Sequence, residues 1–239
     1  TLLRRAATIF RPWQCSSSRE VVCSWTVEPI WHASRQVWEI RSSRSEEIIR
    51  KDQRNQALLA IEFLAIQTLL EHPQCLLSLH GALVAKQGRG VLIVGRGESG
   101  KSTLACALWQ SGWSLLCDDA TLVDIAHGVA YPTPRRVSLR SPSRTLLGEA
   151  LWTRISQTPS CDYTTEGCVF HPDEVDNSER LPSVPLVAGL FLGRSGSTVA
   201  AAACQRVAPA HALLALAPYS SYIRRYDVWE TIRRLRPMV

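Results

Sequence analysis

The chain lacks the cysteine spacing of a zinc site, any long apolar run, and the apolar segment of a signal peptide. Its eight cysteines are scattered and none forms a C-x-x-C pair, which argues against a zinc site of the usual spacing. No stretch approaches the roughly eighteen apolar residues of a membrane-spanning helix, and residues 1–10 are not followed by a signal-peptide core. We therefore expect neither bound zinc nor a membrane partner.

Acidic residues are also relatively few. The 21 Asp and Glu residues stand against 27 Lys and Arg residues, and the net charge is +6. A basic chain favours anionic partners, but no aromatic and basic module of a nucleic-acid-binding domain accompanies the charge. A nucleotide satisfies the same preference, so we expect no nucleic-acid partner. With 46% hydrophobic residues in 239, the chain can form one sizeable core, or a main domain with a small appendage.

The most informative motif is a glycine-rich loop that begins at residue 95 and reads G-R-G-E-S-G-K-S. It has the G-x-x-x-x-G-K-[ST] spacing of a Walker A phosphate-binding loop (P-loop), in which backbone N–H groups surround phosphate oxygens. The lysine reaches the β and γ phosphates, and the serine hydroxyl can bind Mg²⁺. The residues predicted to bind the nucleotide are Gly95, Gly97, Glu98, Ser99, Gly100, Lys101, Ser102 and Thr103.

The flanks of this loop support the interpretation. Residues 91–94 are a short β-branched apolar run typical of a buried strand, and residues 102–109 have the apolar spacing of a helix. A strand, a glycine loop and a helix N-terminus form an anion site, because the free N–H groups and the helix dipole both attract negative charge.

A strand is predicted just before the loop strand. Residues 76–85 are apolar, and only the glycine-bearing link 86–90 separates them from residue 91. Such a short link cannot contain a crossover helix, so the two strands should pair as an antiparallel hairpin. With a turn centred near residues 88 and 89, His80 would lie across from Gly97, at the mouth of the phosphate loop.

Two acidic residues follow the next predicted strand. Residues 114–117 are followed by Asp118 and Asp119, and ligands of open α/β sheets gather at the carboxyl ends of strands. One aspartate can hold Mg²⁺, while the other accepts a proton from an attacking hydroxyl. The alternative is a pair of aspartates that only caps a turn or a helix.

Three arginines follow in an extended, proline-bearing segment. Arg135, Arg136 and Arg140 could neutralise charge on a transferring phosphoryl group. An ordinary surface role for these arginines is an equal alternative.

The rest of the chain is predicted as a small N-terminal β-rich region over residues 1–45 and a main domain over residues 46–239. Trp13, Trp25, Trp31 and Trp38 lie in the first region, where they suit a packing layer or an oligomer contact, with a peptide-docking surface as the alternative. Further predictions are a helix over 45–71 capped by Ser45, a helix over 146–155, a substrate-facing loop over 156–183, paired strands over 187–192 and 198–207, and helices over 209–216 and 228–235.

The order and spacing of His80-Gly81, the hairpin, the phosphate loop and Asp118-Asp119 resemble the HPr kinase/phosphorylase family and its smaller relatives. The resemblance covers about residues 76–123. It implies an α/β fold of the HPr kinase/PEP carboxykinase-like type, with a mixed sheet and a hairpin leading into the phosphate loop. By this resemblance Lys101 binds the phosphates, Ser102 and Asp118 bind Mg²⁺, Asp119 activates a seryl hydroxyl, and His80 supports that chemistry.

The chain also departs from the family pattern. It has Thr103 where the bifunctional enzymes commonly have glutamate, and it lacks their E-x-R-G-x-G signature. The resemblance therefore implies a kinase with a different substrate and no phosphorylase activity.

We expect a cytoplasmic, homo-oligomeric kinase that uses ATP and Mg²⁺ to phosphorylate a seryl or other hydroxyl of a peptide or protein. Some relatives of this size phosphorylate lasso-peptide precursors, which makes such a peptide one candidate. The alternatives are a kinase of a small metabolite, such as free serine, and a regulatory module that binds a nucleotide without transferring phosphate.

Overall fold

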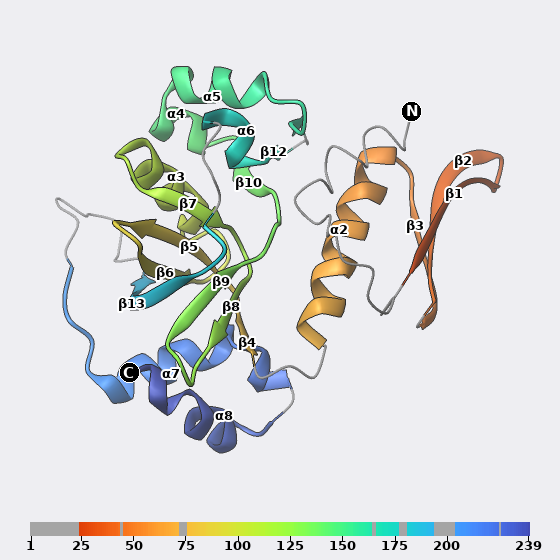
Figure 1. Cartoon of the computed structure of the whole chain (residues 1–239). Helices are drawn as coiled ribbons and strands as arrows, with labels where there is room; N and C mark the ends of the chain where they lie inside the picture. Colours follow the sequence, from red (N-terminus) through yellow and green to blue (C-terminus); the bar gives the residue numbers. More distant parts are fainter. Residues whose placement is uncertain are drawn as a thin grey trace. The chain divides into compact units, whose positions relative to one another are not determined.

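The computed structural model describes residues 24–43, 45–71, 76–163, 166–176, 181–193, 204–224 and 226–239. The chain divides into two compact units, Thr1–Pro73 and Gln74–Val239. Helices and strands occur in both units, and the larger unit is built on a mixed sheet (Figure 1). The predicted α/β class is confirmed at this level.

The first unit contains a meander of three antiparallel strands, β1 (Trp25–His32), β2 (Arg35–Ser42) and β3 (Ser45–Lys51). The helix α2 (Arg54–Glu71) packs against β2 and β3. A meander was expected here, but the predicted helix start at Ser45 is wrong. Residues 45–51 pair with β2 instead, with Ile49 opposite Ile40, because pairing with a neighbouring strand outweighs the local helical pattern.

The first unit therefore extends beyond the boundary expected near residue 45. Its tryptophans differ in exposure: Trp31 is 78% exposed, Trp25 and Trp38 are half-buried, and Trp13 lies outside the described residues. Among the three described tryptophans, the burial of Trp25 and Trp38 fits a packing role and the exposure of Trp31 does not.

The second unit is organised by a seven-stranded sheet with the strand order β4-β8-β9-β13-β6-β5-β7. Strand β13 is parallel to β6, and the other neighbouring pairs are antiparallel. The strands are β4 (Leu76–Leu79), β5 (Gly81–Lys86), β6 (Arg89–Gly95), β7 (Ser114–Cys117), β8 (Thr121–Asp124), β9 (Val129–Pro132) and β13 (Val184–Leu192).

The expected hairpin is formed by β5 and β6. Its two turn residues, Gln87 and Gly88, have φ angles of 52° and 72°, as a type I′ turn requires. This turn lies one residue earlier than we predicted. The register pairs Gly81 with Val94, so His80 is level with Gly95 rather than with Gly97.

The single strand predicted over residues 76–85 is divided at His80 into β4 and β5. Strand β4 pairs with β8, and β5 pairs with β7. The pairs Leu79↔Thr121 and Leu83↔Cys117 share one register, which would place Gly81 opposite Asp119 if the ladder were continuous. The ladder is instead interrupted at this point. The interruption lets the backbone of residues 118–120 turn, and this turn carries the carboxylates of Asp118 and Asp119.

Side chains on the two faces of β5 and β6 enter two different hydrophobic cores. Ala82, Val84 and Ile93 pack with the first group of helices, whereas Leu83 and Leu92 pack with the C-terminal group. Helices therefore cover both faces of the hairpin (Figure 1). The first group is α3 (Lys101–Gln110), α4 (Ser143–Leu147) and α5 (Glu149–Ser156), and the second is α7 (Pro209–Leu216) and α8 (Val228–Leu235).

A small three-stranded sheet adjoins the first group of helices, in the order β10-β12-β11. Its strands are β10 (Val137–Arg140), β11 (Asp162–Tyr163) and β12 (Gly167–Phe170), and the short helix α6 (Pro172–Asp176) follows. The prediction of a substrate-facing loop over 156–183 is therefore wrong for the residues that form β11, β12 and α6. The helix predicted over 146–155 is also divided, because Gly148 has a φ of 83°.

The C-terminal helices begin as predicted, with Pro209 at the first position of α7 and Asp227 capping α8. The Asp227 carboxylate accepts the N–H of Glu230 at 2.9 Å. Of the second strand expected over 198–207, residues 204–207 are not in a strand and the rest lies outside the described residues.

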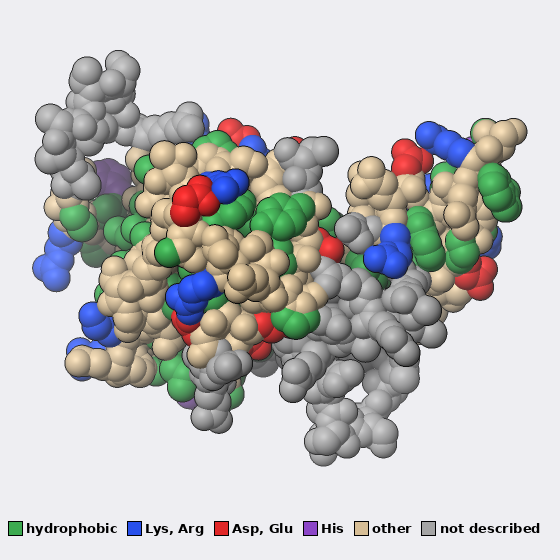
Figure 2. Space-filling model, turned by 90° about the horizontal axis from the view of Figure 1, so that it is seen from above, with side chains coloured by type: hydrophobic (Ala, Val, Ile, Leu, Met, Phe, Trp, Pro, Cys, Tyr) green, Lys and Arg blue, Asp and Glu red, His purple; other side chains and the backbone are tan. Residues whose placement is uncertain are grey.

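In Figure 2, basic side chains of the second unit form small separate groups among acidic and uncharged ones. No helix within the described ranges is long and apolar enough to cross a bilayer.

Candidate functional site

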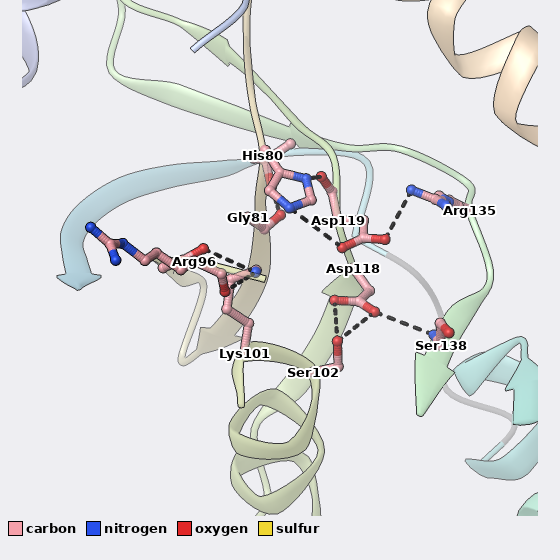
Figure 3. A network of polar contacts seen from close by, with 11 residues as sticks. His80, Gly81, Arg96, Lys101, Ser102, Asp118, Asp119, Arg135 and Ser138 are labelled. Atoms are coloured by element: carbon pink, nitrogen blue, oxygen red, sulfur yellow. Dashed lines mark hydrogen bonds and ion pairs between the residues drawn. The ribbon is translucent and has the colours of Figure 1, made fainter. Parts of the chain in front are cut away.

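The glycine-rich loop follows β6 and leads into α3. Glu98 and Gly100 have φ angles of 62° and 93°, in the left-handed region that turns a chain back on itself. The Lys101 ammonium donates to the carbonyl oxygens of Gly95 at 3.0 Å and Arg96 at 3.1 Å (Figure 3). Lys101 is only 6% exposed, so the loop holds a positive charge next to the N-terminus of a helix. This is the arrangement that attracts a phosphate group.

The first glycine of the loop is sterically required. A Cβ atom at Gly95 would lie 2.6 Å from Ser99 Oγ and 2.9 Å from the carbonyl oxygen of Leu192. We predict that Gly95→Ala lowers the free energy of unfolding by about 1–3 kcal/mol, the usual cost of overpacking, and weakens nucleotide binding. Gly97→Ala is the matched control, because a Cβ there meets nothing within 4 Å. Thermal denaturation of the two variants tests this, and equal stability would contradict it.

Ser102 and Asp118 form the centre of the site. The Ser102 hydroxyl lies 3.0 Å and 2.9 Å from the two carboxylate oxygens of Asp118. The N–H of Ser138, on β10, donates to the same carboxylate at 3.3 Å (Figure 3). Asp118 is 1% exposed, so this carboxylate is buried directly beside the first turn of α3.

The pKa of Asp118 is raised to about 6. Burial is the largest cause and the nearby negative charge of Asp119 is the next, while the hydrogen bonds with Ser102 and Ser138 and the positive charge of Arg135 act in the opposite direction. A cation bound here would favour the ionised carboxylate, so any affinity of Asp118 for a metal ion would increase as the pH rises through about 6.

This pKa predicts a pH-dependent stability. The folded state binds the Asp118 proton more tightly than the unfolded chain, in which aspartate titrates near 4. The stabilising contribution is therefore complete below about pH 4 and is lost as the pH rises through about 6. We expect Asp118→Asn to be more stable than the wild type by about 2–3 kcal/mol at pH 8. Thermal denaturation at pH 4 and 8 tests this, and a difference independent of pH would refute it.

Asp119 lies between a histidine and an arginine. Arg135 Nη1 is 3.0 Å from Asp119 Oδ2, and His80 Nδ1 is 2.9 Å from the backbone carbonyl of Asp119. Because a carbonyl oxygen only accepts, His80 Nδ1 carries the hydrogen in this contact. His80 Nε2 is then directed at Asp119 Oδ1, 4.0 Å away (Figure 3).

Asp119 differs from its neighbour in exposure and backbone conformation. Its side chain is 28% exposed, whereas Asp118 is buried, and its φ of 65° is the left-handed conformation that aspartate tolerates better than most residues. The turn thus gives the two neighbouring acids different surroundings: one faces Ser102 and the other faces solvent beside His80.

The donors present fit Mg²⁺ better than zinc. Within the described ranges, no group of three or more His, Cys, Asp or Glu side chains could hold a metal ion by itself. One carboxylate and one hydroxyl, Asp118 and Ser102, suit Mg²⁺, which keeps several waters and binds through one or two carboxylates together with substrate phosphates.

The structure separates the other predicted site residues. Arg140 pairs with Glu98 of the glycine-rich loop at 2.7 Å, and both side chains are exposed. Thr103 Oγ1 contacts Ser143 Oγ at 2.8 Å, so its hydroxyl is already engaged with α4. Arg136 is not brought to the site, because its Nη1 pairs with Asp162 Oδ2 at 2.8 Å and both side chains are buried. The expectation that Arg136 is a phosphate contact or a surface residue is therefore not supported.

Sequence reasoning missed two polar groups near the site, the backbone N–H of Ser138 and the hydroxyl of Ser143. A backbone donor leaves no mark in the side-chain pattern, so only the path of β10 reveals the first. The second belongs to a helix that begins earlier than predicted.

Part of the chain resembles a known protein family. Residues 46–135 match the family model described as SynChlorMet cassette protein ScmC, which is fewer than half of the 239 residues. The matched stretch contains His80, the glycine-rich loop, Asp118 and Asp119, and it ends at Arg135. No curated protein matches the chain.

Proposed function

We propose that this chain is an ATP- and Mg²⁺-dependent kinase with an HPr kinase/PEP carboxykinase-like core, and that it transfers the γ-phosphoryl group to a seryl hydroxyl of a peptide or protein. The observation that carries this proposal is the position of Asp118 and Asp119. Asp118 meets Ser102 of the phosphate loop at 2.9 Å, and Asp119 lies beside His80 and Arg135. The residues proposed for phosphate binding, for metal binding and for proton transfer thus lie close together.

Each residue would have a distinct role. Lys101, now bonded to loop carbonyls, would bind the β and γ phosphates, while Ser102 and Asp118 would hold Mg²⁺. When bound, this ion neutralises charge on the phosphate oxygens. Asp119 would accept the proton of the acceptor hydroxyl as the new O–P bond forms and the bond to the β-phosphate oxygen breaks, with ADP leaving. Arg135 and His80 would keep the Asp119 carboxylate oriented toward the acceptor.

The exposure of this site favours a large acceptor. Asp119 and Arg135 are 28% and 26% exposed, and His80 is 50% exposed, so the candidate base is reached from the surface. A peptide segment can approach such an open position, whereas kinases of small metabolites gain by enclosing their substrate and excluding water. The matched family description names a cassette protein and no reaction, so the acceptor is argued from the site alone.

Mass spectrometry tests the proposal. The protein is incubated with ATP, Mg²⁺ and a panel of serine-containing peptides, which includes lasso-peptide precursors ending in serine, with free serine in a parallel reaction. We expect a gain of one phosphate on a seryl residue of a peptide. Phosphorylation of free serine alone would favour the small-metabolite kinase, and nucleotide binding without any transfer would favour the regulatory module.

A further inference from the structure

The two neighbouring arginines Arg135 and Arg136 reach different partners. Arg135 pairs with Asp119 at the edge of the sheet, while Arg136 pairs with Asp162 of β11 and also donates to the carbonyl of Ser160 at 3.3 Å. The exposed fractions of the Arg136 and Asp162 side chains are 1% and 7%. A buried ion pair of this kind is costly to form and is not used in the phosphoryl-transfer chemistry described above, so its role needs another explanation.

The explanation lies in the segment that carries both arginines. Residues 133–138, here called the crossing segment, run beside the turn that presents the two acids. Thr133 Oγ1 donates to the carbonyl of Ala120 at 2.6 Å, Arg135 binds Asp119 at 3.0 Å, and the N–H of Ser138 donates to Asp118 at 3.3 Å. The crossing segment therefore contacts every residue of the turn 118–120.

Strand β10 already pairs residues 137 and 138 with β12, and the Arg136–Asp162 pair attaches the part of the segment before β10 to the small sheet. It lies between the two residues that hold the acids, since Arg135 precedes it directly and Ser138 follows two residues later. Two prolines, Pro132 and Pro134, flank Thr133 and remove backbone donors there, so fewer backbone hydrogen bonds can fix the start of the segment. A buried charged pair with defined geometry supplies that fixation.

We infer that Arg136 and Asp162 are positioning residues: their buried ion pair fixes the crossing segment so that Arg135 and the Ser138 N–H hold Asp119 and Asp118 in place. This inference rests on the proposed kinase function, and it gives Arg136 a role in place of phosphate contact. Loss of the pair would leave the phosphate loop intact, because Lys101 is held by Gly95 and Arg96. It would make the positions of the Asp118 and Asp119 carboxylates less well fixed.

The test compares Asp162→Asn with the core variant Ile155→Ala. Ile155 is fully buried on α5, so its truncation lowers stability without removing a polar contact of the crossing segment. For Asp162→Asn we expect hydrogen exchange of residues 133–138 to rise at least about tenfold relative to Ile155→Ala. We also expect kcat to fall about 10- to 100-fold with little change in the KM for ATP, since small misplacement of catalytic groups has effects of this size.

A double variant keeps the inference testable if Asp162→Asn does not fold. Arg136→Gln combined with Asp162→Asn leaves no uncompensated buried charge, which is the main cause of collapse when such a pair is broken. We expect it to fold and to show the same two changes in smaller degree. Wild-type exchange and wild-type kcat in this variant, or changes no larger than those of Ile155→Ala, would overturn the inference. If the wild type transfers no phosphate to any acceptor, the proposed function fails, while hydrogen exchange still decides the positioning role.

Discussion

Lys101→Ala is expected to weaken ATP binding by about 10- to 100-fold, because a charge-assisted hydrogen bond is worth about 1.5–3 kcal/mol. In the structure the Lys101 ammonium is buried within the loop and bonded to two carbonyl oxygens. Phosphate oxygens would replace these partners when a nucleotide binds. The variant removes the buried positive charge that would face these phosphate oxygens. Isothermal titration with ATP should therefore show the loss of affinity directly.

The control for this variant is Lys86→Ala. Lys86 is an exposed residue at the end of β5, where its ammonium lies 5.6 Å from the centre of the Trp113 ring. It has the same charge as Lys101 but lies outside the loop. ATP affinity in Lys86→Ala should match the wild type. An unchanged ATP affinity in Lys101→Ala would show that the lysine of the glycine-rich loop does not bind the nucleotide.

Asp119→Asn is expected to reduce phosphoryl transfer by about 10²- to 10⁴-fold, the contribution usual for a positioned general base. The amide keeps the shape of the side chain but cannot accept the hydroxyl proton. ATP affinity should stay within about threefold of the wild type, because Asp119 contacts Arg135 and His80 and none of the loop residues. Single-turnover transfer from ATP to the acceptor peptide, with ATP titration in parallel, separates the two effects.

A neighbouring carboxylate provides the control for this substitution. Asp124, at the end of β8, bonds to His127 at 2.7 Å and lies outside the proposed site. Asp124→Asn should transfer phosphate at the wild-type rate. Undiminished transfer by Asp119→Asn, or a collapse of its ATP binding, would contradict the role assigned to Asp119.

The parts of the site that are encoded locally could be predicted from the sequence. The strand before the loop, the helix after it and the hairpin are each set by short-range patterns, and the structure confirms β6, α3 and the pairing of β5 with β6. The position of Asp118 and Asp119 after β7 also follows from one short apolar run. Because these elements are consecutive, their arrangement required little knowledge of distant pairings.

The parts that depend on distant partners could not be predicted. Residues 45–51 became a strand through pairing with β2, and β4 separated from β5 because its partner is β8. Nothing in the local sequence distinguishes Arg135 from Arg136. Their roles differ because Arg136 forms a buried pair with Asp162, which lies 26 residues further along the chain, whereas Arg135 pairs with Asp119.

In the proposed kinase, the two acids and the glycine-rich loop act on one bound triphosphate. The most direct test of this claim is ATP binding to the wild type and to Asp118→Asn, measured by isothermal titration at pH 8 with and without Mg²⁺. We predict that Mg²⁺ strengthens ATP binding to the wild type and that this gain is lost in Asp118→Asn. An equal gain from Mg²⁺ in both proteins would show that Asp118 does not hold the ion at the phosphates, and would contradict the account.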